Sequence, residues 1–171
     1  MKIFLIGFMG SGKSTIGRRL VERIGFDFVD TDRLIEMQQC MTVSEIFAQR
    51  GEAAFREIER NILLEIQKLE YAVVSTGGGM PCYGDNMDVM LANGKVAYLK
   101  TSPSTLSRRL LRSQTERPLI KGKTENELQQ YIIEKLAERE AFYNRAHIVM
   151  QTEDFSMEKL LQKLQLMKQE K

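Results

Sequence analysis

The segment Gly7–Thr15 has the residue types and spacing of a phosphate-binding loop. It reads Gly-Phe-Met-Gly-Ser-Gly-Lys-Ser-Thr and matches the pattern GxxxxGK[ST] in full. Its glycines let backbone N–H groups point at a phosphate, and the following helix adds its positive dipole end. Lys13 is a cation for the β- and γ-phosphates, and the Ser14 hydroxyl is a hard oxygen ligand for Mg²⁺. The alternative is a glycine-rich turn without a ligand, but the complete match between an apolar run and a helix favours a nucleotide site.

Two aspartates follow the second apolar run, in the order Val29-Asp30-Thr31-Asp32. Residues two apart in extended backbone face the same side, so both carboxylates are expected at the carboxyl edge of a sheet, where open α/β folds bind ligands. One carboxylate can reach a magnesium ion through water, and the other can accept a proton from a substrate hydroxyl. The structural alternative is that Asp32 only caps a helix that begins at Arg33.

A further glycine-rich segment, Gly77–Gly79, follows the third apolar run. Its glycines allow backbone N–H groups to approach a ligand closely. Arginines at Arg56, Arg117, Arg139 and Arg145 are candidates for binding an anion, although each taken singly is more often a solvated surface charge.

The order of these motifs resembles the shikimate kinase family over nearly the whole chain. The segments that carry the resemblance are the phosphate-binding loop, Asp-Thr-Asp at 30–32, Gly-Glu-Ala-Ala-Phe-Arg-Glu-Ile-Glu at 51–59, Thr-Gly-Gly-Gly at 76–79, Arg-Pro-Leu at 117–119 and Glu-Arg-Glu-Ala-Phe-Tyr at 138–143. A phosphate-binding loop alone is shared by many families, whereas the ordered set is specific. The resemblance implies ATP-dependent phosphorylation of the shikimate 3-hydroxyl, in chorismate and aromatic amino acid biosynthesis.

The resemblance also implies roles for individual residues. Those implied to bind ATP are Gly10, Ser11, Gly12, Lys13, Ser14, Thr15 and Arg117. Those implied to bind shikimate are Asp32, Arg56, Gly78, Gly79 and Arg139. Lys13, Asp32 and Arg117 are implied to be catalytic, with Asp32 the candidate base and Arg117 in a lid. Mg²⁺ would be bound by Ser14, with Asp30 behind a water.

Short apolar runs alternate with helical patterns, which predicts a three-layer α/β/α fold of the P-loop type, similar to nucleoside-monophosphate kinases, with a five-stranded parallel sheet. The expected strands are 3–6, 26–29, 72–75, 96–99 and 148–150. Helices are expected at 14–24, 53–69 and 157–168, the second with Arg56, Glu59 and Arg60 on its polar face. Capping-box spacing at Thr42 and Thr124, and Ser102 before Pro103, predict further helix starts.

The length of 171 residues predicts a single domain spanning 1–171, with a substrate-binding excursion at about 31–60 and a lid at about 112–124. The 25 basic and 23 acidic side chains leave a net charge of +2, too balanced for a general nucleic-acid or membrane surface. Two cysteines without CxxC spacing and no long apolar run place the protein in the reducing cytosol, where we expect a monomer that binds ATP and shikimate.

Two other functions are compatible with a phosphate-binding loop. One is a kinase of the same fold that acts on another small hydroxy acid, such as gluconate. The other is a nucleotide-binding regulatory protein that has lost catalysis, for which a broken Lys13, Asp32 or Arg117 would be diagnostic, and all three are intact. A guanine-specific switch would carry an NKxD-type segment, which the sequence lacks.

Overall fold

The computed structural model describes residues 1–113, 120 and 122–166. Its centre is a parallel five-stranded sheet in the order β2-β3-β1-β4-β5. The strands are β1 (Lys2–Ile6), β2 (Asp27–Asp30), β3 (Ala72–Ser75), β4 (Lys95–Lys100) and β5 (Ile148–Gln151). Each expected strand is therefore confirmed to within one residue at either end, because continuous apolar runs are typical of parallel strands buried on both faces.

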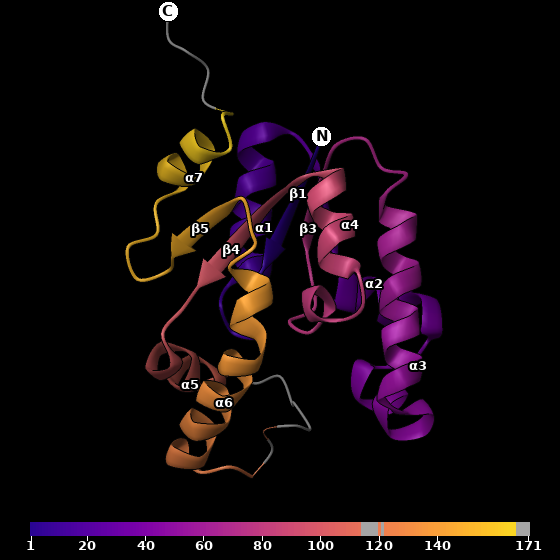
Figure 1. Ribbon diagram of the computed structural model, residues 1–171, viewed down its shortest axis with the longest axis vertical. Coiled ribbons are helices and arrows are strands. Elements are labelled where there is room, and N and C mark those ends of the chain that lie inside the picture. The colour runs from indigo at the N-terminus through magenta and orange to yellow at the C-terminus, as the bar shows by residue number, and fades with distance from the viewer. Residues whose placement is uncertain (114–119, 121, 167–171) are drawn as a thin grey trace, which may run out of the picture.

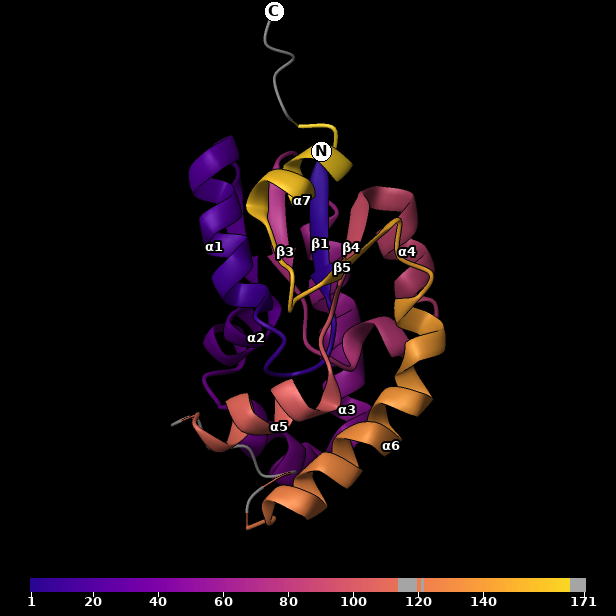
Figure 2. The same cartoon turned by 90° about the vertical axis from the view of Figure 1, so that its left-hand side faces the viewer.

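Helices cover both faces of the sheet (Figure 1). They are α1 (Lys13–Ile24), α2 (Thr31–Gln39), α3 (Val43–Ile66), α4 (Asn86–Asn93), α5 (Pro103–Leu111), α6 (Glu125–Tyr143) and α7 (Met157–Lys163), with a short 3₁₀ helix η1 (Met80–Cys82). Figure 2 shows α1 on one side of the strands and α4 on the other. The predicted three-layer α/β/α fold is confirmed.

The two faces of the sheet contribute to two separate apolar cores. On one face, Phe4, Val74 and Tyr98 pack with side chains of α2, α3, α4 and α6. On the other face, Leu5 and Ala97 pack with side chains of α1 and α7. Alternate residues of one strand thus serve opposite layers, as the period of two in a strand requires.

The structure corrects three predicted helix boundaries. The helix expected at 53–69 begins at Val43 and ends at Ile66, and it contains one non-helical residue, Gly51, at φ 79° and ψ 173°. That conformation suits only glycine and marks a kink between two helical segments. The last helix, expected at 157–168, ends at Lys163.

The third correction concerns Asp30, the last residue of β2, and Asp32, the second residue of α2. Helix α2 begins at Thr31, and the Asp30 carboxylate accepts a hydrogen bond from the backbone N–H of Arg33 at 3.4 Å. The capping residue is therefore Asp30, and Asp32 lies in the first helical turn. Predicted starts at Thr42 and Thr124 are confirmed as capping boxes, and Ser102 caps α5.

The described part of the chain contains no helix that is both long and apolar enough to cross a bilayer. Cys40 is exposed, Cys82 is half-buried, and both thiols are free.

Candidate active site

The phosphate-binding loop connects β1 to α1 and borders a cavity of about 470 Å³. The cavity is lined by residues 9–16, Asp30, Asp32, residues 75–76, Gly78, Arg109 and Thr152. Gly12 caps α1 in a left-handed conformation with φ 97°. This conformation aims the amino end of the helix at the cavity, which makes the cavity a suitable site for an anion.

Lys13 is bound to the loop that carries it. Its Nζ donates to the carbonyl oxygens of Gly7 and Phe8, at 2.9 Å each, and the side chain is buried. The ammonium group therefore lies inside the curve of the loop, close to where a bound phosphate chain would run.

Hard oxygen donors gather beside Lys13. The Ser14 hydroxyl donates to Asp30 Oδ2 at 2.6 Å and lies 3.1 Å from Ser75 Oγ. Among the described residues, no group of three or more histidine, cysteine or acidic side chains could hold a metal by itself. The donor set of hydroxyl and carboxylate oxygens fits Mg²⁺, which commonly takes its remaining ligands from water and nucleotide phosphates.

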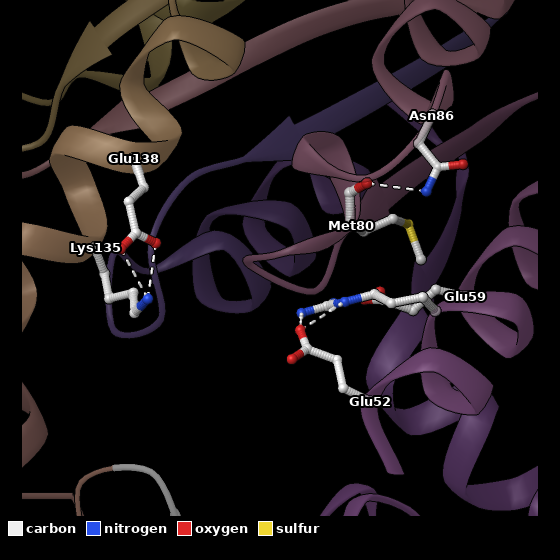
Figure 3. A network of polar contacts seen from close by, with 7 residues as sticks. Glu52, Glu59, Met80, Asn86, Lys135 and Glu138 are labelled. Carbon is white, nitrogen blue, oxygen red and sulfur yellow. Dashed lines mark hydrogen bonds and ion pairs between the residues drawn. The ribbon is translucent and has the colours of Figure 1, made fainter.

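A second cluster lies next to this cavity and is built around Arg56 on α3. Its Nη1 donates to Glu59 Oε2 at 2.6 Å, while Nε and Nη2 both donate to Glu52 Oε1, at 3.2 and 2.8 Å. Figure 3 shows Glu52 and Glu59 near one another at α3. A Cβ added to Gly79 would lie 2.7 Å from Arg56 Nη1, so a larger residue there would displace this guanidinium from its present position.

Glu59 is the most deeply buried acidic side chain of this cluster, with 1% of its side chain exposed. Burial raises the pKa of its carboxyl to about 7, against the opposite effect of Arg56. Burial disfavours the charge of Arg56, yet Glu59 and Glu52 together raise the pKa of its guanidinium. Arg56 is therefore cationic throughout the physiological range.

Arg139 on α6 approaches the glycine segment from the other side. Its guanidinium lies over the Phe8 ring at 5.5 Å, and its Nη1 would be 3.6 Å from a Cβ added to Gly78. The Tyr143 hydroxyl, one turn further along α6, donates to the Gly78 carbonyl oxygen at 2.5 Å. The glycine segment is thus fixed between α3 and α6.

A family model described as shikimate kinase matches residues 9–168. The chain belongs to the shikimate kinase family.

Relatives and solved structures agree with this membership. The chain is 46% identical to a shikimate kinase of Parabacteroides distasonis over 152 residues, which cover 89% of this chain and 88% of the relative. It superposes on a crystal structure of shikimate kinase from Bacteroides thetaiotaomicron with a TM-score of 0.88 and 40% identity, covering 96% of this chain and 94% of that one. A shikimate kinase from Acinetobacter baumannii, solved in complex with shikimate, gives a TM-score of 0.85 at 34% identity, covering 96% and 90%.

The site residues expected for a shikimate kinase fall into three groups in this structure. Residues 10–15, Asp30, Asp32 and Gly78 line the cavity at the phosphate-binding loop. Arg56, Gly79 and Arg139 form the adjacent cluster. Arg117, and with it most of the expected lid at 112–124, lies outside the described residues.

Sequence reasoning on the shikimate kinase pattern missed two features of the site. Arg109 on α5 lines the cavity and donates to the carbonyl oxygens of Gly10 and Ser11, at 3.3 Å each. A separation of 99 residues from Gly10 gives no local signal of this contact. Glu59 was expected on the polar face of its helix and is instead buried, because Gly77, from a segment distant in the chain, lies against its carboxyl group.

The candidate Arg145 and the single histidine of the sequence, His147, both lie away from the site. Arg145, two residues beyond the end of α6, pairs with Asp88 of α4 at the surface. His147 accepts a hydrogen bond on Nδ1 from the backbone N–H of Val96 at 3.1 Å, which gives it a structural role beside β4.

Proposed function

We propose that this chain transfers the γ-phosphoryl group of ATP to the 3-hydroxyl of shikimate. One observation carries the proposal: the glycine segment, residues 77–79, lies next to both the phosphate-binding loop and the arginine cluster. A Cβ added to Gly78 would lie 3.4 Å from Gly7 O and Met9 N of the phosphate-binding loop, and 3.6 Å from Arg139 Nη1. A phosphate chain on the loop and a carboxylate on the arginines would therefore face each other across this segment.

The nucleotide half of the reaction rests on residues 10–15. Backbone N–H groups of the loop and the amino end of α1 would bind the phosphates, and Lys13 would exchange its two carbonyl partners for phosphate oxygens. Arg117 is proposed to reach the phosphates from the lid, where a cation that arrives on closure would neutralise charge and exclude water.

Ser14 would bind Mg²⁺ directly, and Asp30 would bind it through water. The pair is suited to this because its hydroxyl and carboxylate oxygens already lie 2.6 Å apart. The ion would neutralise charge on the β- and γ-phosphates.

The acceptor half of the reaction rests on the neighbouring cluster. Arg56 and Arg139 would bind the shikimate carboxylate, since a planar guanidinium matches a carboxylate in two parallel hydrogen bonds. The backbone of Gly78 and Gly79 and the Asp32 carboxylate would orient the ring hydroxyls. The 3-hydroxyl oxygen then bonds to the γ-phosphorus, the bond from phosphorus to the leaving oxygen of ADP breaks, and Asp32 accepts the hydroxyl proton.

The alternatives raised by the sequence have less support. A gluconate-type kinase would need a different acceptor motif, whereas the chain keeps Arg56, Gly79 and Arg139 of the shikimate kinase pattern. A non-catalytic nucleotide-binding protein would be marked by a broken Lys13, Asp32 or Arg117, and the sequence keeps all three.

Several broader properties belong to the same proposal. We infer a single domain with excursions at about 31–60 and 112–124 that acts as a monomer. The near-neutral charge supports small-molecule ligands over nucleic acid or membrane partners, and the free thiols support a reducing, cytosolic compartment.

The test is an ADP-release assay with purified protein, ATP and Mg²⁺, run with shikimate, with gluconate and with no acceptor. Shikimate alone should trigger ADP release, and Lys13→Ala should abolish it while the protein stays folded. Release of ADP with gluconate, or none with shikimate, would refute the proposal.

A further inference from the structure

All three nitrogen atoms of the Arg56 guanidinium already donate to carboxylates of this chain. Glu59 accepts from Nη1 at 2.6 Å. Glu52 accepts from Nε and Nη2 at 3.2 and 2.8 Å, along the side edge that a planar carboxylate binds with two hydrogen bonds. A second carboxylate cannot take that edge while Glu52 holds it.

The two glutamates differ in how easily each can move away from Arg56. Glu59 has 1% of its side chain exposed and lies beside Asp32 under the glycine segment, where a Cβ on Gly77 would be 2.8 Å from its Oε1. Glu52 has 67% of its side chain exposed and directly follows Gly51, the kink of α3. Exposed ion pairs within a helix contribute little to stability, so Glu52 can turn into water at low cost.

The positive charge around Arg56 is already countered by carboxyl groups of this chain before any substrate arrives. Two guanidinium groups, Arg56 and Arg139, face the carboxyl groups of Glu52, Glu59 and Asp32. An incoming carboxylate would gain little attraction from this cluster as it stands. Removal of the Glu52 carboxylate from Arg56 would leave two guanidinium groups facing two carboxyl groups, which lowers the repulsion against an incoming acid.

We propose that Glu52 is a competing carboxylate that occupies Arg56 in the free protein and gives up its place to the carboxylate of the substrate. The inference rests on the proposed function and deepens it, because it identifies the residue whose displacement sets the affinity for an acid. This exchange also favours acids over neutral polyols, because a neutral ligand that displaced Glu52 would not replace its negative charge beside Arg56.

The test compares shikimate binding to wild type, Glu52→Gln and Glu57→Gln by titration calorimetry in the presence of ADP. Glu57 is exposed on the same helix and makes no ion pair within the described chain, so it controls for the change in net charge. Glu52→Gln should bind shikimate about two- to fivefold more tightly, the range that a lost exposed ion pair allows. Glu57→Gln should match wild type.

Three outcomes would overturn the inference. These are an unchanged affinity in Glu52→Gln, a weaker affinity, which would make Glu52 a support that holds Arg56 in place, or an equal gain in both variants. Thermal unfolding of each variant, measured alongside, shows that the comparison is between folded proteins. A wild-type protein that neither binds nor phosphorylates shikimate would instead refute the proposed function.

Discussion

The buried pair of Glu59 and Arg56 makes the proposed acceptor site sensitive to pH. Burial raises the pKa of Glu59 to about 7, and the nearby carboxylate of Asp32 adds to this rise, whereas Arg56 and Arg139 oppose it. Glu59 therefore holds Arg56 in position, and the free-energy cost of keeping its buried carboxyl ionised depends on pH. Such a cost is typical of ionisable groups placed for binding.

The first prediction concerns stability against pH. A carboxyl whose pKa rises from 4.5 to about 7 on folding binds its proton more tightly in the folded state. The stabilisation of the folded state by this tighter proton binding is complete below pH 4.5 and is lost as the pH rises to about 7. The unfolding free energy of wild type should fall over this range relative to Glu59→Gln, by up to about 3 kcal/mol.

Urea denaturation from pH 4.5 to 8 measures this difference. Glu57→Gln, on the exposed face of the same helix, should follow the wild-type profile. Parallel profiles for wild type and Glu59→Gln would show that Glu59 does not carry the predicted proton.

The second prediction concerns substrate affinity. Arg139→Ala removes a charged hydrogen-bond donor, so the KM for shikimate should rise about 10- to 100-fold while the KM for ATP stays within about twofold. Steady-state kinetics with each substrate varied in turn separates the two effects. Arg145→Ala, on the same segment but paired with Asp88 at the surface, should leave both constants near wild type. An unchanged KM for shikimate in Arg139→Ala would remove this arginine from the acceptor site.

At the level of elements, local patterns were predictable and long-range contacts were not. The phosphate-binding loop, the capping boxes at Thr42 and Thr124 and the five strands follow from spacing within a few residues. Burial of Glu59 and the reach of Arg109 to Gly10 depend on elements far apart in the chain. The capping box at Thr42 predicts the start of α3, but the continuity of this helix with the pattern at 53–69 was missed, because Gly51 interrupts the helical period.

The third prediction tests the kink in α3. In a regular helix, glycine to alanine stabilises by about 0.5–1 kcal/mol. At φ 79° and ψ 173°, alanine is strained, so Gly51→Ala should instead destabilise by about 1–3 kcal/mol. Chemical denaturation gives the sign directly, and a stabilised variant would mean that α3 runs straight through residue 51.

At the scale of the whole molecule, the chain is nearly neutral, yet three basic side chains gather at one edge of the sheet. The 25 basic side chains barely exceed the 23 acidic ones, yet Lys13, Arg56 and Arg139 lie around the same glycine segment. This edge lies where the strand order β2-β3-β1-β4-β5 reverses direction about β1. Open parallel sheets bind ligands at such a reversal, because the connections on either side diverge and leave a crevice.

The central claim is that this one edge transfers phosphate from ATP to shikimate, and ³¹P nuclear magnetic resonance of the reaction mixture tests it most directly. With ATP, Mg²⁺ and shikimate, a phosphomonoester signal should appear in a one-to-one ratio with ADP, and it should be absent without shikimate. Conversion of ATP to ADP and inorganic phosphate alone, or no consumption of ATP, would contradict the account.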